Sequence, residues 1–376
     1  MSKVVRLLAE LIAIPSVNPA FLPAAHPHAG EKQVAEFIAN GASRAGLAVA
    51  WQRVLPQRAN VLVRLRPTGK IRQRVLLAPH LDTVNVARET QFKPVQRHGR
   101  IYGRGACDTK GSVAVMLQAL LDLAAAAQRP QTTEIIFVGL VDEESGQSGS
   151  RYLAAKKFRA DLAIVGEPTR LAVATAHKGS VWLEVVTHGR AAHGSTPWHG
   201  VNAIQAMAEV TQALANRYAA QLKKKSHRLL GSGTINIGTI HGGVQPNIVP
   251  DFCRVGVDRR TLPGESEAWT RQNLAAFLKA AGLAAKVGNV KLKLCPALET
   301  DPREPLVRQF LRLNRQQQAV GLNYFCDAAV LAGGGIPSVV FGPGDIAQAH
   351  TADEWITVAQ LEQGRVKLLR FLKSLP

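Results

Sequence analysis

The chain has 376 residues, of which 46% are hydrophobic and 19% are charged. This length exceeds one usual domain, so two domains are expected, and the low charged fraction argues against extended disorder. The net charge of +19 comes from basic residues spread along the chain, densest at 64–74 and 223–228, and only 5% of residues are aromatic, so a solvated basic surface is favoured over a nucleic-acid interface.

The N-terminal segment predicts a surface helix rather than a targeting or membrane segment. Its apolar residues recur at helical spacing at Val4, Leu7, Leu8, Leu11 and Ile12, with charges between them. A signal peptide needs an unbroken apolar core and a membrane span needs about 20 apolar residues. The four cysteines are widely scattered and form no CxxC pair, which fits a reduced, cytoplasmic setting.

Residues 1–178 read as alternating strands and helices. Short apolar runs at 75–78, 135–141 and 162–165 predict strands, and the Ala- and Leu-rich segment 112–127 predicts a helix. Strands that alternate with helices indicate a mainly parallel sheet with helices on both faces. The fold class is therefore α/β in this part of the chain.

The pattern of predicted strands and helices changes after about residue 178, and the earlier α/β pattern returns after Pro296. The intervening segment 179–295 has the order β-α-β-β-α-β, which is typical of an inserted ferredoxin-like domain. Its expected elements are strands at 181–187, 234–240, 252–258 and 290–294 and helices at 201–218 and 265–281. A helix at 306–318, a strand at 338–341 and a helix at 358–375 then complete a discontinuous first domain of residues 1–178 and 296–376.

Polar side chains follow the ends of three predicted strands. His80 follows the first, Glu143 and Glu144 follow the second, and Glu167 follows the third. In open parallel sheets, ligands bind beyond the carboxyl ends of the strands. We therefore expect these four side chains to lie on one rim, although they are far apart in the sequence.

Each of these motifs, taken alone, is weak evidence for a metal site. His80-Leu81-Asp82 offers a metal ligand and a carboxylate to fix its tautomer, or else a surface pair. Glycines around Asp108, in 103–111, indicate a tightly packed loop; a phosphate-binding loop would need Gly where Thr109 precedes Lys110.

The acidic pair and a late histidine complete the set. Glu143 and Glu144 raise each other's pKa unless cations neutralise them, and the alternative is a solvated acidic turn. His350 follows a turn-rich loop at 341–345, although a lone histidine there is more often structural. Cys107 and Cys326 adjoin these motifs, but neither has a histidine partner that would make it a nucleophile.

Together these motifs resemble the M20 family of metallopeptidases and deacylases, most closely its acetylornithine deacetylase and succinyl-diaminopimelate desuccinylase branch. The matching segments follow the family order over almost the whole chain. They are 79–84, 103–111, 142–144, 166–169, 192–193, 245–251 and 342–355.

The resemblance implies roles for individual residues. Asp108 resembles a carboxylate that bridges two metal ions, with His80 and Glu167 on one ion and Glu144 and His350 on the other. Glu143 resembles the general base and Asp82 the partner of His80. In the inserted domain, His193 resembles a residue that reaches the partner subunit's site in a homodimer, and Asn247 and Arg259 resemble groups that hold the substrate.

The donor types agree with these expectations. Nitrogen and oxygen ligands suit two zinc ions, with cobalt tolerated. The expected function is removal of an N-acyl group from an amino acid. The alternatives are a carboxypeptidase or dipeptidase with the same catalytic atoms, a succinyl-diaminopimelate desuccinylase and, in a different class, a non-catalytic basic binding protein.

Overall fold

The computed structural model describes residues 1–376 except 128 and 291–294. The chain divides into two compact units, and each is considered by itself. The larger unit comprises Met1–Thr175, Thr300–Val320 and Cys326–Pro376, and the smaller comprises Ala176–Glu299 and Gly321–Phe325. The larger unit is therefore built from segments on both sides of the smaller one.

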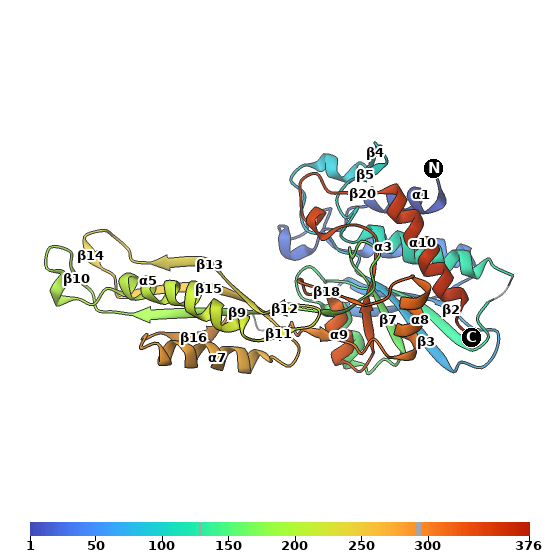
Figure 1. Ribbon diagram of the computed structural model, residues 1–376. Coiled ribbons are helices and arrows are strands. Elements are labelled where there is room, and N and C mark those ends of the chain that lie inside the picture. The colour runs from blue at the N-terminus through green and yellow to red at the C-terminus, as the bar shows by residue number, and fades with distance from the viewer. Residues whose placement is uncertain (128, 291–294) are drawn as a thin grey trace. The chain divides into compact units, whose positions relative to one another are not determined.

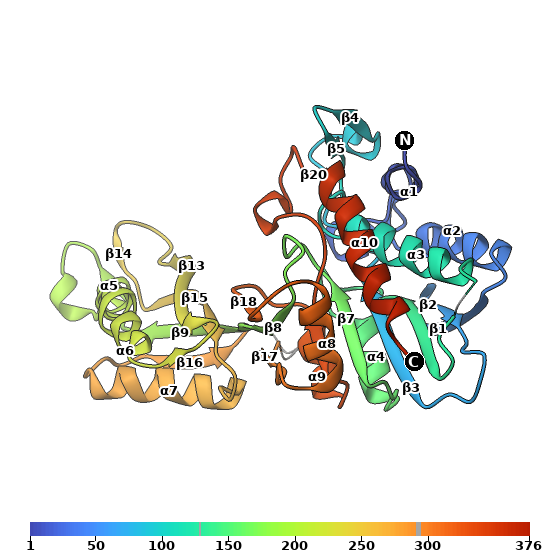
Figure 2. The same cartoon turned by 45° about the vertical axis from the view of Figure 1, so that its right-hand side comes forward.

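The main sheet has nine strands (Figures 1 and 2). Their spatial order is β1 (Ala48–Leu55), β2 (Arg58–Leu65), β6 (Thr133–Gly139), β3 (Gln73–Pro79), β7 (Leu162–Gly166), β19 (Ser338–Val340), β8 (Ala174–His177) and β17 (Leu298–Glu299), with β18 (Val320–Leu322) paired to β8. The central strands β6, β3, β7 and β19 are parallel to one another. Every residue of β6 and β7 is buried, as expected for strands covered on both faces.

Helices cover this sheet in two groups. The larger unit contains α1 (Lys3–Ile12), α2 (Lys32–Arg44), α3 (Lys110–Ala124), α4 (Ser148–Ala155), α8 (Pro305–Leu313), α9 (Asp327–Gly333) and α10 (Val358–Lys373). Helix α3 packs against α1 and α10, whereas α4 packs against α9. The connections β3–α3–β6 and β6–α4–β7 run in opposite directions across the sheet, so right-handed crossovers put α3 and α4 on opposite faces.

Short elements connect this framework. They are the 3-10 turns η1 (Pro19–Phe21), η2 (Glu89–Phe92) and η5 (Ile346–Gln348) and a small sheet of β4 (Val95–Arg97), β5 (Arg100–Tyr102) and β20 (Trp355–Thr357). The small sheet joins the segment before Asp108 to the segment after His350, because β5 pairs with β20.

The smaller unit has the predicted ferredoxin-like order. Its sheet runs β13 (Thr234–Gly242), β15 (Phe252–Thr261), β9 (Gly179–His188) and β16 (Lys286–Asn289), and α5 (Ala203–Ala213) and α7 (Glu267–Ala280) pack on it. Further short elements are η4 (Leu214–Tyr218), α6 (Ala219–Lys223), η3 (Pro197–His199), and the strand pairs β10 (Ala192–His193) with β14 (Ile248–Val249) and β11 (Ser226–His227) with β12 (Gly231–Ser232). The predicted α/β fold with an inserted ferredoxin-like domain is confirmed.

One predicted strand lies mostly outside the described residues, one helix ends earlier than predicted, and several elements were not predicted. The last predicted strand of the smaller unit, 290–294, lies outside the described residues except for Val290, and the described strand β16 ends at Asn289. Helix α8 ends at Leu313 rather than at 318. The left-handed φ of 56° at Arg315 does not continue a right-handed helix, and beyond it the Gln316 side chain hydrogen-bonds both the N–H (2.8 Å) and the carbonyl (3.0 Å) of Val173. Strands β1 and β2 and helix α2 were not predicted.

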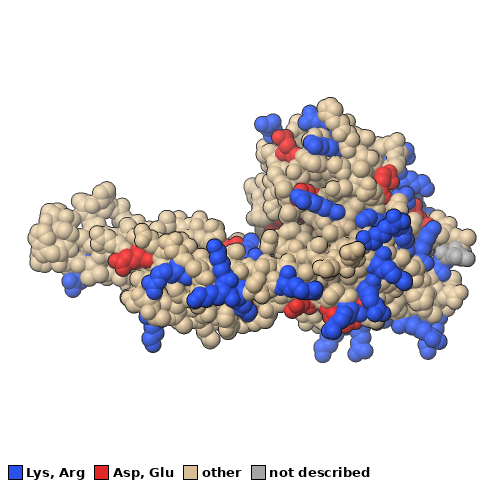
Figure 3. Space-filling model, in the orientation of Figure 1, with Lys and Arg blue, Asp and Glu red and all other residues tan. Residues whose placement is uncertain are grey.

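The basic side chains are distributed widely over the surface. On the face shown in Figure 3, Lys and Arg are spread over both parts of the chain rather than gathered in one stripe. Part of the basic run at 64–74 is neutralised, because Arg64 and Arg74 both pair with the buried Glu134 (3.2 and 2.8 Å). Among the described residues, none of the helices is both long enough and apolar enough to cross a lipid bilayer.

Candidate metal centre

The carboxyl ends of the central strands carry the predicted ligands. His80 directly follows β3, and its backbone pairs with Leu140, which directly follows β6. Glu143 and Glu144 lie three residues further along that second segment, and Glu167 directly follows β7. Because β6, β3 and β7 are adjacent and parallel, these side chains meet at one edge of the sheet.

Asp108 lies between two histidines. Its Oδ1 is 3.0 Å from Nε2 of His80, and its Oδ2 is 3.3 Å from Nε2 of His350. His80 is buried, whereas the side chain of His350 is 53% exposed. The two oxygens of one carboxylate therefore face two different imidazoles.

Two further carboxylates flank this pair. Glu167 Oε1 lies 3.8 Å from His80 Nε2, and Glu144 Oε2 lies 3.2 Å from His350 Nε2. One potential ligand atom each from His80, Asp108 and Glu144 lie within 4.8 Å of one another. The structure thus brings all five predicted ligands together.

Asp82 organises this edge of the sheet. Its carboxylate accepts the backbone N–H groups of Glu143 (3.1 Å) and Glu144 (3.0 Å). Nδ1 of His80 donates to the Asp82 carbonyl (3.0 Å), with the carboxylate oxygen at 3.5 Å. Asp82 therefore orients His80 so that Nε2 faces the carboxylates, and it also fixes the turn that carries the acidic pair.

A second carboxylate, Glu354, holds the loop that presents Asp108. It accepts the backbone N–H groups of Gly105 (3.0 Å), Cys107 (2.8 Å) and Asp108 (2.9 Å), and it pairs with Arg104 at 2.7 Å. Glu354 was not among the residues predicted from the sequence. Its place four residues after a predicted ligand is the signal that was available.

A third group of buried polar residues fixes the start of the acidic turn. Arg58 pairs with Glu31 (2.5 Å) and Asp142 (3.1 Å), and Asn18 donates to both Asp82 (2.7 Å) and Asp142 (3.0 Å). Asn18, Glu31 and Arg58 were not predicted from the sequence, because their partners lie far away along the chain and no local pattern marks them.

Burial and like charge shape the protonation of this cluster. Burial raises the pKa of Glu143 and of Glu167 well above the ordinary range, and neighbouring carboxylates raise both further. The hydrogen bonds that His350 donates to Asp108 and Glu144 raise the pKa of His350 to about 10. Burial also raises the pKa of Asp108, but hydrogen bonds from His350 and His80 outweigh that and lower it.

The donor set fits divalent metal ions. Several carboxylates crowded into a buried edge repel one another, and a cation of charge +2 reverses that repulsion. Imidazole nitrogen and carboxylate oxygen are ligands that zinc accepts, and cobalt and manganese tolerate the same atoms. The residues present therefore match the chemistry of a metal centre.

Metal binding to the metal-free protein is expected to release protons. Ligands must be deprotonated, whereas His350 with a pKa of about 10 carries a proton at neutral pH. Since each released proton makes binding more favourable as pH rises, zinc affinity is expected to increase from pH 6 to pH 8. Calorimetric titration in buffers of different ionisation enthalpy measures the number of protons released, and His350→Ala should release about one fewer. An affinity independent of pH would contradict this expectation.

The other predicted site residues belong to the smaller unit. His193 is exposed and its Nδ1 lies 2.7 Å from the hydroxyl of Ser195, and Asn247 is also exposed. Arg259, the other residue predicted to hold the substrate, is 1% exposed and donates to Glu265 at 3.0 Å. The structure gives this guanidinium an ion-pair partner within the chain.

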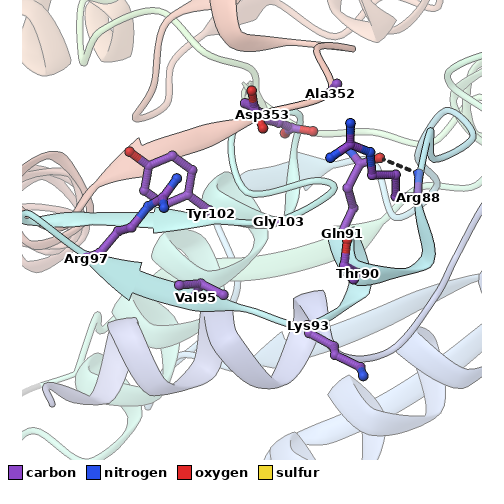
Figure 4. A pocket seen from close by; sticks show the side chains of 11 residues that line it. Arg88, Thr90, Gln91, Lys93, Val95, Arg97, Tyr102, Gly103, Ala352 and Asp353 are labelled. Atoms are coloured by element: carbon purple, nitrogen blue, oxygen red, sulfur yellow. Dashed lines mark hydrogen bonds between the residues drawn. The ribbon is translucent and has the colours of Figure 1, made fainter.

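A separate pocket of about 280 Å³ lies beside the Glu354 segment (Figure 4). It is lined by the basic side chains of Arg88, Lys93 and Arg97, and Arg97 stacks on the ring of Tyr102 at 4.4 Å. The described lining residues include none of the five predicted ligands. The candidate metal centre is therefore distinct from this pocket.

The four cysteines are not catalytic groups. All four side chains are buried. Cys107 donates its thiol to the Asp345 carbonyl (3.2 Å), and burial raises the pKa of both Cys107 and Cys326 above the ordinary thiol value. A thiol with a raised pKa is a poor nucleophile.

Comparisons with known proteins agree with this architecture. Proteins named acetylornithine deacetylase are similar to this chain: one from Vibrio cholerae is 31% identical over 338 residues, which is 87% of each chain. One from Proteus mirabilis is 31% identical over 96% of this chain and 94% of its own.

Solved structures share the fold at lower sequence identity. A tripeptidase from Staphylococcus aureus superposes with a TM-score of 0.78 at 23% identity, covering 99% of this chain and 97% of its own. An M20 family metallo-carboxypeptidase from Sulfolobus solfataricus gives 0.76 at 18% identity, covering 99% of each chain. Residues 76–374 match the model of peptidase family M20/M25/M40. This chain therefore belongs to that family of metal-dependent hydrolases.

Proposed function

We propose that this protein is a dinuclear metal-dependent amidohydrolase that removes the N-acyl group from an amino acid. The observation that carries the proposal is the position of Asp108, whose two oxygens face His80 and His350 at 3.0 and 3.3 Å. A carboxylate placed in this way is suited to bridge two cations. We assign His80 and Glu167 to one ion and Glu144 and His350 to the other.

The ions, zinc in the first instance, would acidify a water molecule and polarise the amide carbonyl. Glu143, next to the ligand Glu144, takes the proton of the attacking water. As the C–N bond breaks, Glu143 passes this proton to the leaving amine, and the products are a free amine and a carboxylate. A carboxylate whose pKa burial has raised is a stronger base than an ordinary glutamate, which suits this task.

The acyl group and the amino acid of the proposed substrate are inferred from the names of related proteins. The names of the proteins that are 31% identical favour an N-acetylated amino acid such as N-acetylornithine. The second candidate is a peptidase that cuts a C-terminal residue or a dipeptide, since the same catalytic atoms serve both reactions. The similarity of the fold to that of a metallo-carboxypeptidase supports this second candidate.

A substrate panel tests the proposal. N-acetyl amino acids, including N-acetylornithine, N-succinyl-diaminopimelate and dipeptides are incubated with the protein after loading with zinc or cobalt. Release of free amine only from N-acetyl substrates supports the deacetylase. Preferred cleavage of dipeptides would replace it with the peptidase, and tight metal binding without any amide cleavage would favour a non-catalytic protein.

We further assign substrate contacts to the smaller unit. Asn247 is exposed and is available to bind the substrate. Arg259 would have to exchange Glu265 for the substrate carboxylate, which replaces one ion pair by another. Such an exchange is feasible only if the incoming carboxylate reaches the buried guanidinium.

We infer that the smaller unit forms a subunit interface, and two features of it support this inference. Strand β13 is an edge of its sheet, and exposed apolar side chains cluster in this unit. They are Trp198, Val201, Ile204, Ile240, Val244, Ile248 and Phe252. Ile204 on α5 also reaches the space beside Gly243, just after β13. Exposed apolar patches and free sheet edges are sites of association, so we assign a homodimer through this unit.

Mixing two inactive variants tests whether His193 serves the partner subunit. His193→Ala and Glu143→Gln are each expected to be nearly inactive. After subunit exchange, half of the dimers are mixed and one of their two sites is intact, so about a quarter of the wild-type activity should return. Absence of recovery, or a fully active monomer by light scattering, would contradict the arrangement.

A further inference from the structure

A buried carboxylate behind the acidic turn has no part in the proposed reaction. Asp327 is the first residue of α9, is 1% exposed and belongs to the larger unit. Its Oδ1 lies 2.5 Å from the hydroxyl of Ser150. Its Oδ2 is buried and has no hydrogen-bond partner within the described residues. A buried group that is only partly satisfied costs free energy, so it calls for a physical reason.

Three contacts lead from Asp327 to the backbone of Glu143. The first is the contact with Ser150, which lies in the first turn of α4. The Ser150 hydroxyl also lies 3.0 Å from the carbonyl of Gln147. The Gln147 side chain in turn donates to the carbonyl of Glu143 at 2.7 Å.

The backbone around Gln147 reinforces this path. Gln147 has a left-handed φ of 50° and directly precedes α4, and its N–H donates to the carbonyl of Asp142 at 2.6 Å. Asp142 is also left-handed, with a φ of 71°. Both residues lie in a conformation that favours glycine, so the turn depends on its hydrogen bonds to keep its shape.

We propose that Asp327 is a positioning residue that holds the turn 142–147, and with it the carboxylate of Glu143, through Ser150 and Gln147. This inference rests on the proposed function, because that function gives Glu143 its role as base. Asp327 acts through its neighbours and touches neither substrate nor the reacting atoms. The effect is transmitted by hydrogen bonds, because the contact between Asp327 and Ser150 ties α9 to α4, the helix that directly follows the turn.

The single hydroxyl proton of Ser150 determines which residue donates in each of its two hydrogen bonds. A hydroxyl has one proton, yet Ser150 lies within hydrogen-bond distance of two oxygens, those of Asp327 and Gln147. Both bonds form when Asp327 carries a proton and donates to Ser150, while Ser150 donates to Gln147. An asparagine at position 327 also donates and should therefore substitute.

The surroundings of Asp327 agree with a neutral acid. Burial raises the pKa of Asp327 to about 7, and the charge of Asp82 raises it further. The hydrogen bond from Ser150 and the charges of His80 and Arg151 act in the opposite direction. Glu143 and Glu167 also repel a negative charge at this position.

Kinetics of matched variants test the inference. The variants are Asp327→Ala, Asp327→Asn and Ser150→Ala, and Asp301→Ala is the control, because Asp301 is an exposed aspartate of the same unit that pairs only locally with Arg303. Misplacement of a catalytic group by about 1 Å costs about 10²-fold in rate. We expect Asp327→Ala and Ser150→Ala to lose about that much kcat with KM near the wild-type value, and Asp327→Asn and the control to retain kcat.

Hydrogen exchange gives a readout that needs neither metal nor turnover. In the metal-free protein, the amides of 143–149 are expected to exchange about tenfold faster in Asp327→Ala and Ser150→Ala, because the turn opens more often. Asp327→Asn should exchange like the wild type. If Asp327→Ala does not fold, Ser150→Ala and Asp327→Asn supply the same comparison.

The possible outcomes separate this inference from the proposed function. Unchanged kcat and unchanged exchange in Asp327→Ala and Ser150→Ala would overturn it. An Asp327→Asn variant as impaired as Asp327→Ala would also overturn it, because charge rather than a donated hydrogen bond would then be required. A wild-type protein that cleaves no amide would remove the proposed function, while the exchange experiment would still decide whether Asp327 holds the turn.

Discussion

Replacing Glu143 by glutamine is expected to lower kcat by about 10²–10⁴-fold while the protein keeps its metal. Glutamine preserves the shape of the side chain but cannot accept the proton of the attacking water. The five predicted ligands remain, because Glu143 is not one of them and its backbone stays bonded to Asp82. Metal content by elemental analysis and steady-state kinetics on one preparation measure both effects.

Neighbouring substitutions show whether this loss is specific. Glu144→Gln should lose metal as well as activity, because Glu144 lies 3.2 Å from His350 in the ligand cluster. Ser145→Ala, in the same turn, should change neither. Near-normal kcat in Glu143→Gln would remove Glu143 as the base, and a simultaneous loss of metal would show that it is a ligand.

Replacing Glu354 by alanine is expected to lower the free energy of unfolding by about 3–5 kcal/mol. The change leaves the buried Arg104 without its carboxylate at 2.7 Å. It also removes the acceptor for three backbone N–H groups, including that of Asp108 at 2.9 Å. Breaking a buried ion pair on one side costs more than the pair contributes, because the remaining charge stays buried.

Denaturant unfolding of the metal-free protein measures this loss without interference from metal binding. Asp353→Ala is the matched control, since Asp353 is the exposed neighbour and should change stability by less than about 0.5 kcal/mol. Zinc affinity should also fall in Glu354→Ala, because the Asp108 loop loses its anchor. Equal stability of the two variants would show that other contacts hold the loop.

The positions of chemically reactive residues relative to strands were predictable from the sequence. His80, Glu143 and Glu167 follow apolar runs, and the runs at 135–141 and 162–165 became β6 and β7 with every residue buried. A parallel sheet collects the ends of its strands at one edge, so local patterns were enough to predict which side chains converge. The ferredoxin-like order of the smaller unit followed from the same local periodicity.

Only the tertiary structure showed what holds these side chains in place. Glu354, Asn18, Arg58 and Asp327 each bond to at least one partner that is 84 or more residues away. No periodicity, cap or motif records such contacts, because they depend on how distant segments pack. The burial of Arg259 against Glu265 likewise follows from packing within the smaller unit. Local patterns therefore predicted the candidate ligands and the strand ends that carry them, whereas long-range polar contacts, which form only when the chain is compact, decided the geometry of these side chains.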